Sequence, residues 1–187
     1  EGVISEDDLL TILSAEEFHR GADDIQATAG DYNQAVQTLR SAMKNRQNTV
    51  QCDLANYTGD LTDLFNSLLE DAVVHTGKPT EGDYLAWQYG GYSATISYSY
   101  EGTGMNISII YTITYYDTLE QEKKVDDAVS KLMDSFSLSG KNTYEKIKTI
   151  YDWVCDNVEY DYDHLSNSSY TLQYTAYAAL INRTAVC

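Results

Sequence analysis

Two long runs of alternating apolar and polar residues, joined by a short turn, constrain this sequence more than any other feature. The runs cover 84–100 and 106–116, and the turn between them is Glu101-Gly102-Thr103-Gly104. Side chains of a β-strand point alternately to opposite faces, so a period of two predicts strands with one buried face. A glycine-containing turn between two such runs predicts an antiparallel hairpin. Gly90–Gly91 interrupts the first run, which predicts a bulge or a break.

A third strand and two amphipathic helices flank this hairpin in the sequence. Thr49–Tyr57 alternates in the same way and predicts the strand. Asp60 suits the N-cap of a helix that is apolar on one face as far as Val73, and a second such helix follows Asp117. Strands with one apolar face are covered by a helical layer in stable folds. We therefore predict the α+β fold class, with a two-layer helix and antiparallel-sheet domain over 48–140.

Helical segments are expected on both sides of this domain. Residues 1–47 predict a helical arm, with a helix after the N-cap candidate Asp31. Ser139–Asn142 predicts a domain joint, and residues 141–187 then begin a second, helical domain. Its first helix starts at Thr143 and has apolar residues at helical spacing, which we expect to be buried. They are Ile147, Ile150, Tyr151, Val154, Cys155 and Val158.

A polar loop follows that helix, and its titratable residues invite a functional interpretation. Asp161, Asp163 and His164 lie together, but this pattern does not match a calcium-binding loop. We expect His164 to be solvated. The sequence then predicts a short helix over Thr175–Ile181 and a loop that leads to Cys187.

The charge balance excludes some classes of function. The chain carries 12 basic and 29 acidic residues, a net charge of −17, and no cluster of basic residues. Such a surface repels phosphate backbones, so we expect no nucleic-acid partner and interpret the acidity as favouring solubility. No run of 18 apolar residues occurs, so we expect no membrane span, and the first residues lack the apolar core of a signal peptide.

The cysteines and histidines do not form a metal-ligand pattern. Three cysteines occur without a CxxC pair, and the three histidines are scattered, so we expect no metal and no cofactor. One disulfide remains possible. We interpret Cys52 and Cys155 as packing residues, since each lies on an apolar face. Trp87 is expected to pack on the sheet, and Trp153 to be wedged against a domain that these 187 residues do not include. The tyrosines of the predicted hairpin strands are also expected to pack on the sheet.

The last quarter of the chain resembles a known family. The helix YEKIKTIYDWVCDNVEYD, the polar loop and the segment TAYAALINRTAVC are similar, in order and spacing, to the start of the transglutaminase-like, papain-type thiol domain of bacterial proteins. The resemblance implies that Cys187 is the nucleophile, at the N-terminus of a helix that lowers its pKa. It also implies a histidine and then an aspartate further along the chain.

Neither of those two residues follows Cys187 in this sequence, so we expect these 187 residues alone to be inactive. The resemblance implies a secreted or surface-attached bacterial parent that attacks amide bonds of a protein or peptide, such as a cell-wall peptide, through a cysteine thioester. An alternative is a non-catalytic surface protein with a partial or degenerate fold that serves binding or adhesion. A weaker alternative assigns the binding of wall glycans or peptides to the tyrosine-rich strands.

Overall fold

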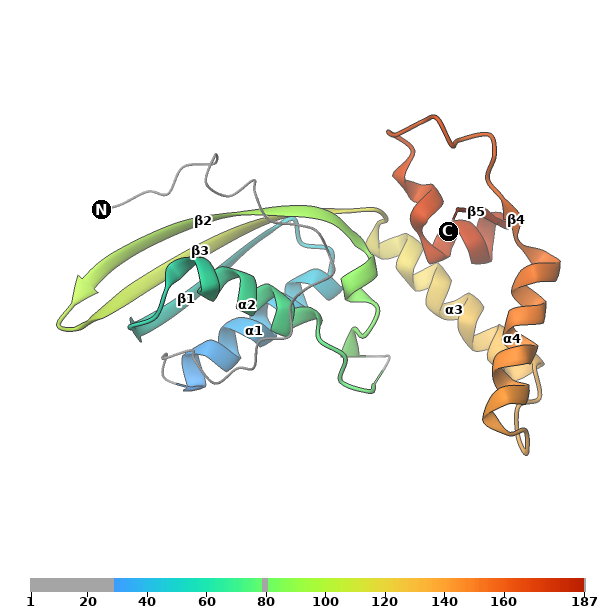
Figure 1. The fold of residues 1–187 in the computed structure, drawn as a ribbon, viewed down its shortest axis with the longest axis horizontal. Coiled ribbons are helices and arrows are strands. Elements are labelled where there is room, and N and C mark those ends of the chain that lie inside the picture. The colour runs from blue at the N-terminus through green and yellow to red at the C-terminus, as the bar shows by residue number, and fades with distance from the viewer. Residues whose placement is uncertain (1–28, 79–80, 187) are drawn as a thin grey trace. The chain divides into compact units, whose positions relative to one another are not determined.

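The structure is a computed structural model that describes residues 29–78 and 81–186 (Figure 1). The chain divides into two compact units, the first ending at Tyr115 and the second beginning at Tyr116. Each unit is described by itself. The first 28 residues of the expected N-terminal arm and Cys187 lie outside the described residues.

A three-stranded antiparallel sheet forms the frame of the first unit. The strands are β1 (Thr49–Tyr57), β2 (Tyr89–Glu101) and β3 (Gly104–Tyr115), in the order β1-β3-β2. The expected hairpin is therefore present. Its pairing shifts register between Tyr89 and Gly91, which confirms the irregularity predicted at the glycine pair. A 3₁₀ turn, η4 (Leu85–Trp87), precedes β2, so the strand begins later than predicted.

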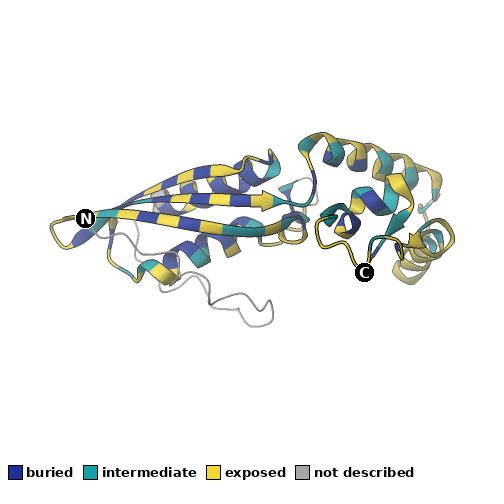
Figure 2. Cartoon of the chain, turned by 90° about the horizontal axis from the view of Figure 1, so that it is seen from above, coloured by how far each residue is buried: buried dark blue, intermediate teal, exposed yellow. Residues whose placement is uncertain are grey.

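Two helices, α1 (Ala29–Lys44) and α2 (Leu61–Val73), cover one face of this sheet (Figure 1). Asp60 caps α2 as predicted, because its Oδ1 accepts hydrogen bonds from the backbone N–H groups of Thr62 (2.7 Å) and Asp63 (3.3 Å). The covered face of β3 presents Ile109 and Tyr111, both fully buried. Figure 2 shows the resulting alternation of buried and exposed residues along the strands.

The opposite face of the sheet is polar. On β2 it presents the exposed residues Ser93, Thr95, Ser97 and Ser99, and on β3 the exposed Ile110 is its apolar exception. Small hydroxyl side chains hydrogen-bond to water, so this face needs no covering layer.

An arginine joins the two helices at the C-terminal end of α2. The Arg40 Nε donates to the carbonyl oxygen of Ala72 (2.7 Å), and its Nη2 donates to those of Val74 (2.6 Å) and Asp71 (3.2 Å). The last carbonyl groups of a helix have no partner within the helix and carry a partial negative charge. Arg40 therefore caps α2 from α1.

The second unit contains two longer helices and a set of short elements. The helices are α3 (Leu119–Ser135) and α4 (Thr143–Asn157). They are followed by β4 (Glu159–Tyr160), η5 (Thr171–Tyr174), the π-helix η6 (Ala178–Asn182) and β5 (Thr184–Ala185). The segment predicted as a short helix over Thr175–Ile181 is helical from residue 176, mostly as the π-helix η6, and part of the predicted loop after it forms β5.

The helix α4 begins at Thr143, as predicted, and its N-cap is Asn142. Asn142 Oδ1 accepts from the Glu145 N–H (3.0 Å), and Glu145 Oε2 accepts from the Asn142 N–H (2.9 Å). This is a complete capping box.

The expected burial of α4 is wrong for the described residues. None of its residues is buried, and Tyr144, Ile147 and Tyr151 are 72%, 62% and 66% exposed. Cys155 is exposed as well, which corrects its interpretation as a packing residue. Helical periodicity identifies an apolar face but does not identify what covers it.

The structural division also differs from the expected domains. The helix α1, which was expected to belong to a separate arm, packs against β1 and α2 in the first unit. The helix α3, expected over the sheet, belongs to the second unit and contacts η6 there. Both helices are amphipathic, so pattern alone does not decide which one packs on the sheet. In the described part of the chain, no helix is long and apolar enough to cross a membrane.

Adjacent residues of β3 provide a test of this architecture. Ile109 is fully buried and Ile110 is 39% exposed on the polar face. Ile109→Ala should lower the free energy of unfolding by about 2–5 kcal/mol, because it leaves a cavity between sheet and helices. Ile110→Ala should lower it by less than about 1 kcal/mol. Urea titration followed by circular dichroism measures both, and equal losses would contradict the assigned faces.

Candidate functional site

The segment that leads to Cys187 is held by backbone hydrogen bonds on two sides. β4 and β5 pair in parallel, with Glu159 opposite Thr184 and Tyr160 opposite Ala185. The Asp161 N–H donates to the Ala185 carbonyl oxygen (3.0 Å). On the other side, the N–H of the buried Val186 donates to the carbonyl oxygen of Gln173 (3.0 Å). These hydrogen bonds therefore hold the backbone in place as far as Val186.

A carboxylate–imidazole pair lies in the loop after β4. The ring Nδ1 of His164 is 2.9 Å from each carboxylate oxygen of Asp161. The His164 backbone N–H also donates to Asp161 Oδ1 (3.2 Å). The carboxylate is buried, whereas 42% of the His164 side chain is exposed. A buried carboxylate on one ring nitrogen orients an imidazole and leaves Nε2 as its second functional nitrogen.

An aromatic ring completes this arrangement. Tyr170 stacks on the imidazole of His164, with 4.1 Å between the ring centres and 29° between the planes. His164 is partly exposed to solvent, in agreement with the sequence prediction, and its ring also has two partners. The signal that sequence reasoning passed over is the spacing of Asp161 and His164, three residues apart in a turn, where an aspartate side chain commonly binds the backbone and side chains that follow it.

Two buried polar side chains lie between this loop and η6. Thr175 Oγ1 donates to the Leu172 carbonyl oxygen (2.7 Å) and accepts from the Ala178 N–H (3.2 Å). Gln173 is 1% exposed, and within the described residues its Oε1 has no hydrogen-bond partner. Burial of an amide oxygen without a partner is costly. Gln173 is therefore an unusual feature of the segment whose backbone binds Val186.

Trp153 is fixed by an arginine at the end of η6. The Arg183 guanidinium carbon lies 4.5 Å from the centre of the Trp153 ring system, a cation–π contact. Arg183 has a positive φ of 64°, which is uncommon for a residue with a side chain. Its carbonyl oxygen accepts from the Glu159 N–H (2.8 Å). Trp153 also makes an edge contact with Phe136, so it packs within its own unit.

The predicted site residue itself, Cys187, lies outside the described residues. The two described cysteines differ sharply. Cys52 is buried on β1, as expected, and burial raises the pKa of its thiol to about 11. Cys155 is exposed on α4. The described residues contain no cluster of three or more His, Cys, Asp or Glu side chains that could bind a metal ion.

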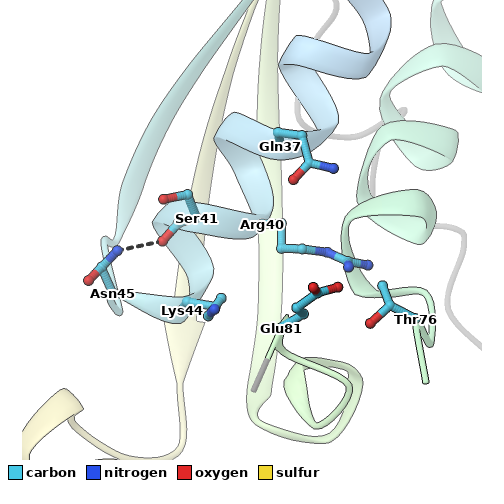
Figure 3. A pocket seen from close by; sticks show the side chains of 7 residues that line it. All are labelled: Gln37, Arg40, Ser41, Lys44, Asn45, Thr76 and Glu81. Atoms are coloured by element: carbon cyan, nitrogen blue, oxygen red, sulfur yellow. Dashed lines mark hydrogen bonds between the residues drawn. The ribbon is translucent and has the colours of Figure 1, made fainter. Parts of the chain in front are cut away.

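The first unit contains an open hollow of about 560 Å³ between α1 and the loop after α2 (Figure 3). It is lined by Gln37, Arg40, Ser41, Lys44, Asn45, Thr76 and Glu81. Arg40 caps α2, and Glu81 pairs with Lys78 (3.0 Å). Nearby, the buried Asp83 accepts from the Thr76 N–H (2.7 Å) and holds this loop. We assign these residues to structural roles.

Trp87, which was expected to pack on the sheet, follows this loop and is 78% exposed.

Comparisons with protein-family models, curated proteins and solved structures found no match for this chain. The candidate site therefore stands on the geometry of its own residues and on the sequence resemblance.

Removal of the Asp161 carboxylate should loosen its loop. Asp161→Ala removes the carboxylate that accepts hydrogen bonds from the backbone and ring of His164. The backbone amide of His164 should therefore exchange its hydrogen at least about tenfold faster, which corresponds to a loss of about 1.4 kcal/mol in the free energy of opening. Asp163→Ala is the matched control, because Asp163 is exposed. Hydrogen exchange followed by NMR measures both variants. Similar exchange in the two would contradict the assigned pair.

The two described thiols should differ in reactivity. Native protein at neutral pH should react with iodoacetamide at Cys155 and spare Cys52, because Cys52 is inaccessible and its raised pKa keeps it protonated. Peptide mapping by mass spectrometry measures each site. In urea Cys52 should become reactive, and equal rates in the native protein would contradict its burial.

Proposed function

We propose that this chain belongs to a transglutaminase-like protein that cleaves or transfers at amide bonds, with Cys187 as its nucleophile. The sequence similarity of 143–187 to the start of such a domain supports this function. In the described part, the order of elements agrees with the expected helix, polar loop and second helical segment. The strand β5 lies at the end of that series, and Val186 follows it before the cysteine.

The observation that carries the proposal is the anchoring of Val186. A nucleophile needs a defined position relative to the groups around it, because small displacements strongly reduce the rate. Hydrogen bonds from Asp161 to Ala185 and from Val186 to Gln173 restrain both sides of the approach to residue 187. An unanchored tail would provide no such restraint.

The proposed chemistry proceeds through a thioester. The Cys187 thiolate attacks the carbonyl carbon of an amide, the C–S bond forms as the C–N bond breaks, and the amine leaves with a proton. Water or a second amine then attacks the thioester, the C–S bond breaks, and the thiolate is regenerated. By the family resemblance, a histidine and an aspartate C-terminal to the cysteine would act as the base and its orienting group. His164 precedes Cys187 and does not match that position.

The proposed setting is the outside of a bacterial cell, with a protein or peptide substrate such as a cell-wall peptide. The resemblance to secreted and surface-attached proteins supports this setting, and the tyrosine-rich composition agrees with it. A non-catalytic binding protein of the same fold is the second candidate. The exposed apolar residues of α4 favour it, since contiguous exposed apolar surface is typical of interaction sites.

Thiol reactivity at low pH separates these candidates. In the full-length natural protein at pH 6, iodoacetamide should modify Cys187 at least about tenfold faster than Cys155, since each unit of pKa depression raises the thiolate fraction about tenfold. The exposed Cys155 is an internal reference in the same molecule. Mass spectrometry of the labelled peptides gives both rates.

A variant of the cysteine provides a second test that does not depend on labelling. Cys187→Ser should retain the circular dichroism spectrum and lose amide hydrolysis or amine transfer with peptide substrates. If Cys187 and Cys155 react equally slowly and the serine variant behaves like the natural protein, the thiol mechanism is wrong and the binding protein is favoured.

A further inference from the structure

Among the described residues, the outer edge of β2 has no strand partner. The sheet order β1-β3-β2 places β2 at one side of the sheet, and no described strand pairs with its outer edge (Figure 1). The strand is 13 residues long, without proline, and its single charged residue is the terminal Glu101. Natural proteins usually protect edges with short strands, charges or proline, because an open edge is a template for another strand.

Carboxylates lie on the side of α2 that faces β2. The Tyr92 hydroxyl on β2 donates to Asn66 Oδ1 on α2 (3.0 Å), which identifies the side of α2 that faces β2. Asp63 and Glu70 lie three residues before and four residues after Asn66, so both share that side of the helix. The charged side chains of α2 and β2 are all acidic.

The Glu70 carboxyl lies in a partly buried position beside a second carboxylate. Partial burial and the neighbouring charge of Asp71 raise the pKa of the Glu70 carboxyl. Tyr92 also experiences the charge of Glu70, although burial is the main cause of the rise of its pKa to about 12. A cation placed beside Glu70 would relieve this repulsion.

Two tyrosine rings lie further along β2, on the same face as Tyr92. Tyr98 and Tyr100 contact each other edge to face, with 5.8 Å between ring centres, and Tyr100 is 74% exposed. The negative faces of such rings attract ammonium and guanidinium groups. Carboxylates and aromatic rings on one side of one strand therefore favour the same type of ligand.

We propose that the outer edge of β2 binds an extended basic peptide as a fourth strand. Its backbone pairs with the open hydrogen-bonding groups of β2, and alternate side chains point to opposite faces of the enlarged sheet. Lysine or arginine at every second position meets Asp63, Glu70 and the tyrosine rings. The intervening side chains are small and polar and lie beside Ser93, Thr95 and Ser97. A second copy of the chain is a poorer occupant, because it would bring the same carboxylates together.

A synthetic peptide as long as β2, with alternating lysine and threonine, tests the proposal. Fluorescence anisotropy of the labelled peptide with the intact protein should give saturable binding. A peptide of the same composition with its lysines grouped at one end should bind much more weakly. Equal binding of the two peptides would show non-specific attraction to an acidic protein and would overturn the proposal.

Charge variants locate the binding. The double variant Asp63→Asn and Glu70→Gln should weaken binding of the alternating peptide about threefold to tenfold, as expected for two exposed ion pairs. Asp53→Asn is the matched control, because Asp53 is exposed on the polar face of β1. If Asp53→Asn weakens binding as much as the double variant, the α2 side of the edge is not the site.

Backbone pairing is tested on the peptide alone, so that no strand variant can fail to fold. Alternate peptide N–H groups face the edge, so methylation of one alternate set of amides should abolish binding while methylation of the other set is tolerated. Bound peptide should also slow hydrogen exchange within 92–100. Equal effects of the two methylated sets, or light scattering that shows a dimer with the same protection of 92–100 in the absence of peptide, would overturn the proposal.

Discussion

The first unit depends on the packing of β3 beneath two helices. Both hydrogen-bond ladders of the sheet run through this strand, and its covered face presents Ile107, Ile109, Tyr111 and Ile113, all buried. Tyr111 also makes a polar bond across the layers, since its hydroxyl donates to the Phe65 carbonyl oxygen (2.8 Å). Burial raises the pKa of that hydroxyl well above its ordinary value, so it remains a donor. A loss of β3 would therefore separate both partner strands and the helical layer at once.

The second unit is organised differently, with more polar than apolar burial. Its described buried residues are Val125, Ala178 and Val186 on the apolar side and Asp117, Glu122, Asp161, Gln173 and Thr175 on the polar side. Capping boxes define the starts of α3 and α4, and backbone bonds define the course of β5. Directional polar contacts restrain a chain at particular points, whereas apolar burial supplies most of the free energy of folding. This unit is thus well defined locally although it buries little apolar surface.

Much of the first unit could be predicted from the sequence, because its signals are local. The bounds of β1 and α2 and the cap at Asp60 follow from periodicity and from one side chain. The partner of each amphipathic face is a long-range property, so the places of α1 and α3 and the exposure of Cys155 could not be read from spacing. In the candidate site, the order of elements was predictable, whereas the ring partners of His164 depend on how the loop folds back.

The position of Arg40 has a consequence for how the helical layer can move. Apolar ridges on neighbouring helices tolerate several alignments, because one turn of 5.4 Å along the axis brings similar side chains together again. The guanidinium of Arg40 tolerates one alignment, since its three carbonyl partners occur only at the end of α2. A slip by one turn would place the Arg40 guanidinium beside carbonyl groups that already accept hydrogen bonds within the helix. It would also leave the three carbonyl groups at the end of α2 without a donor. Arg40 therefore prevents α1 and α2 from sliding past each other, so the two helices can move over the sheet only together.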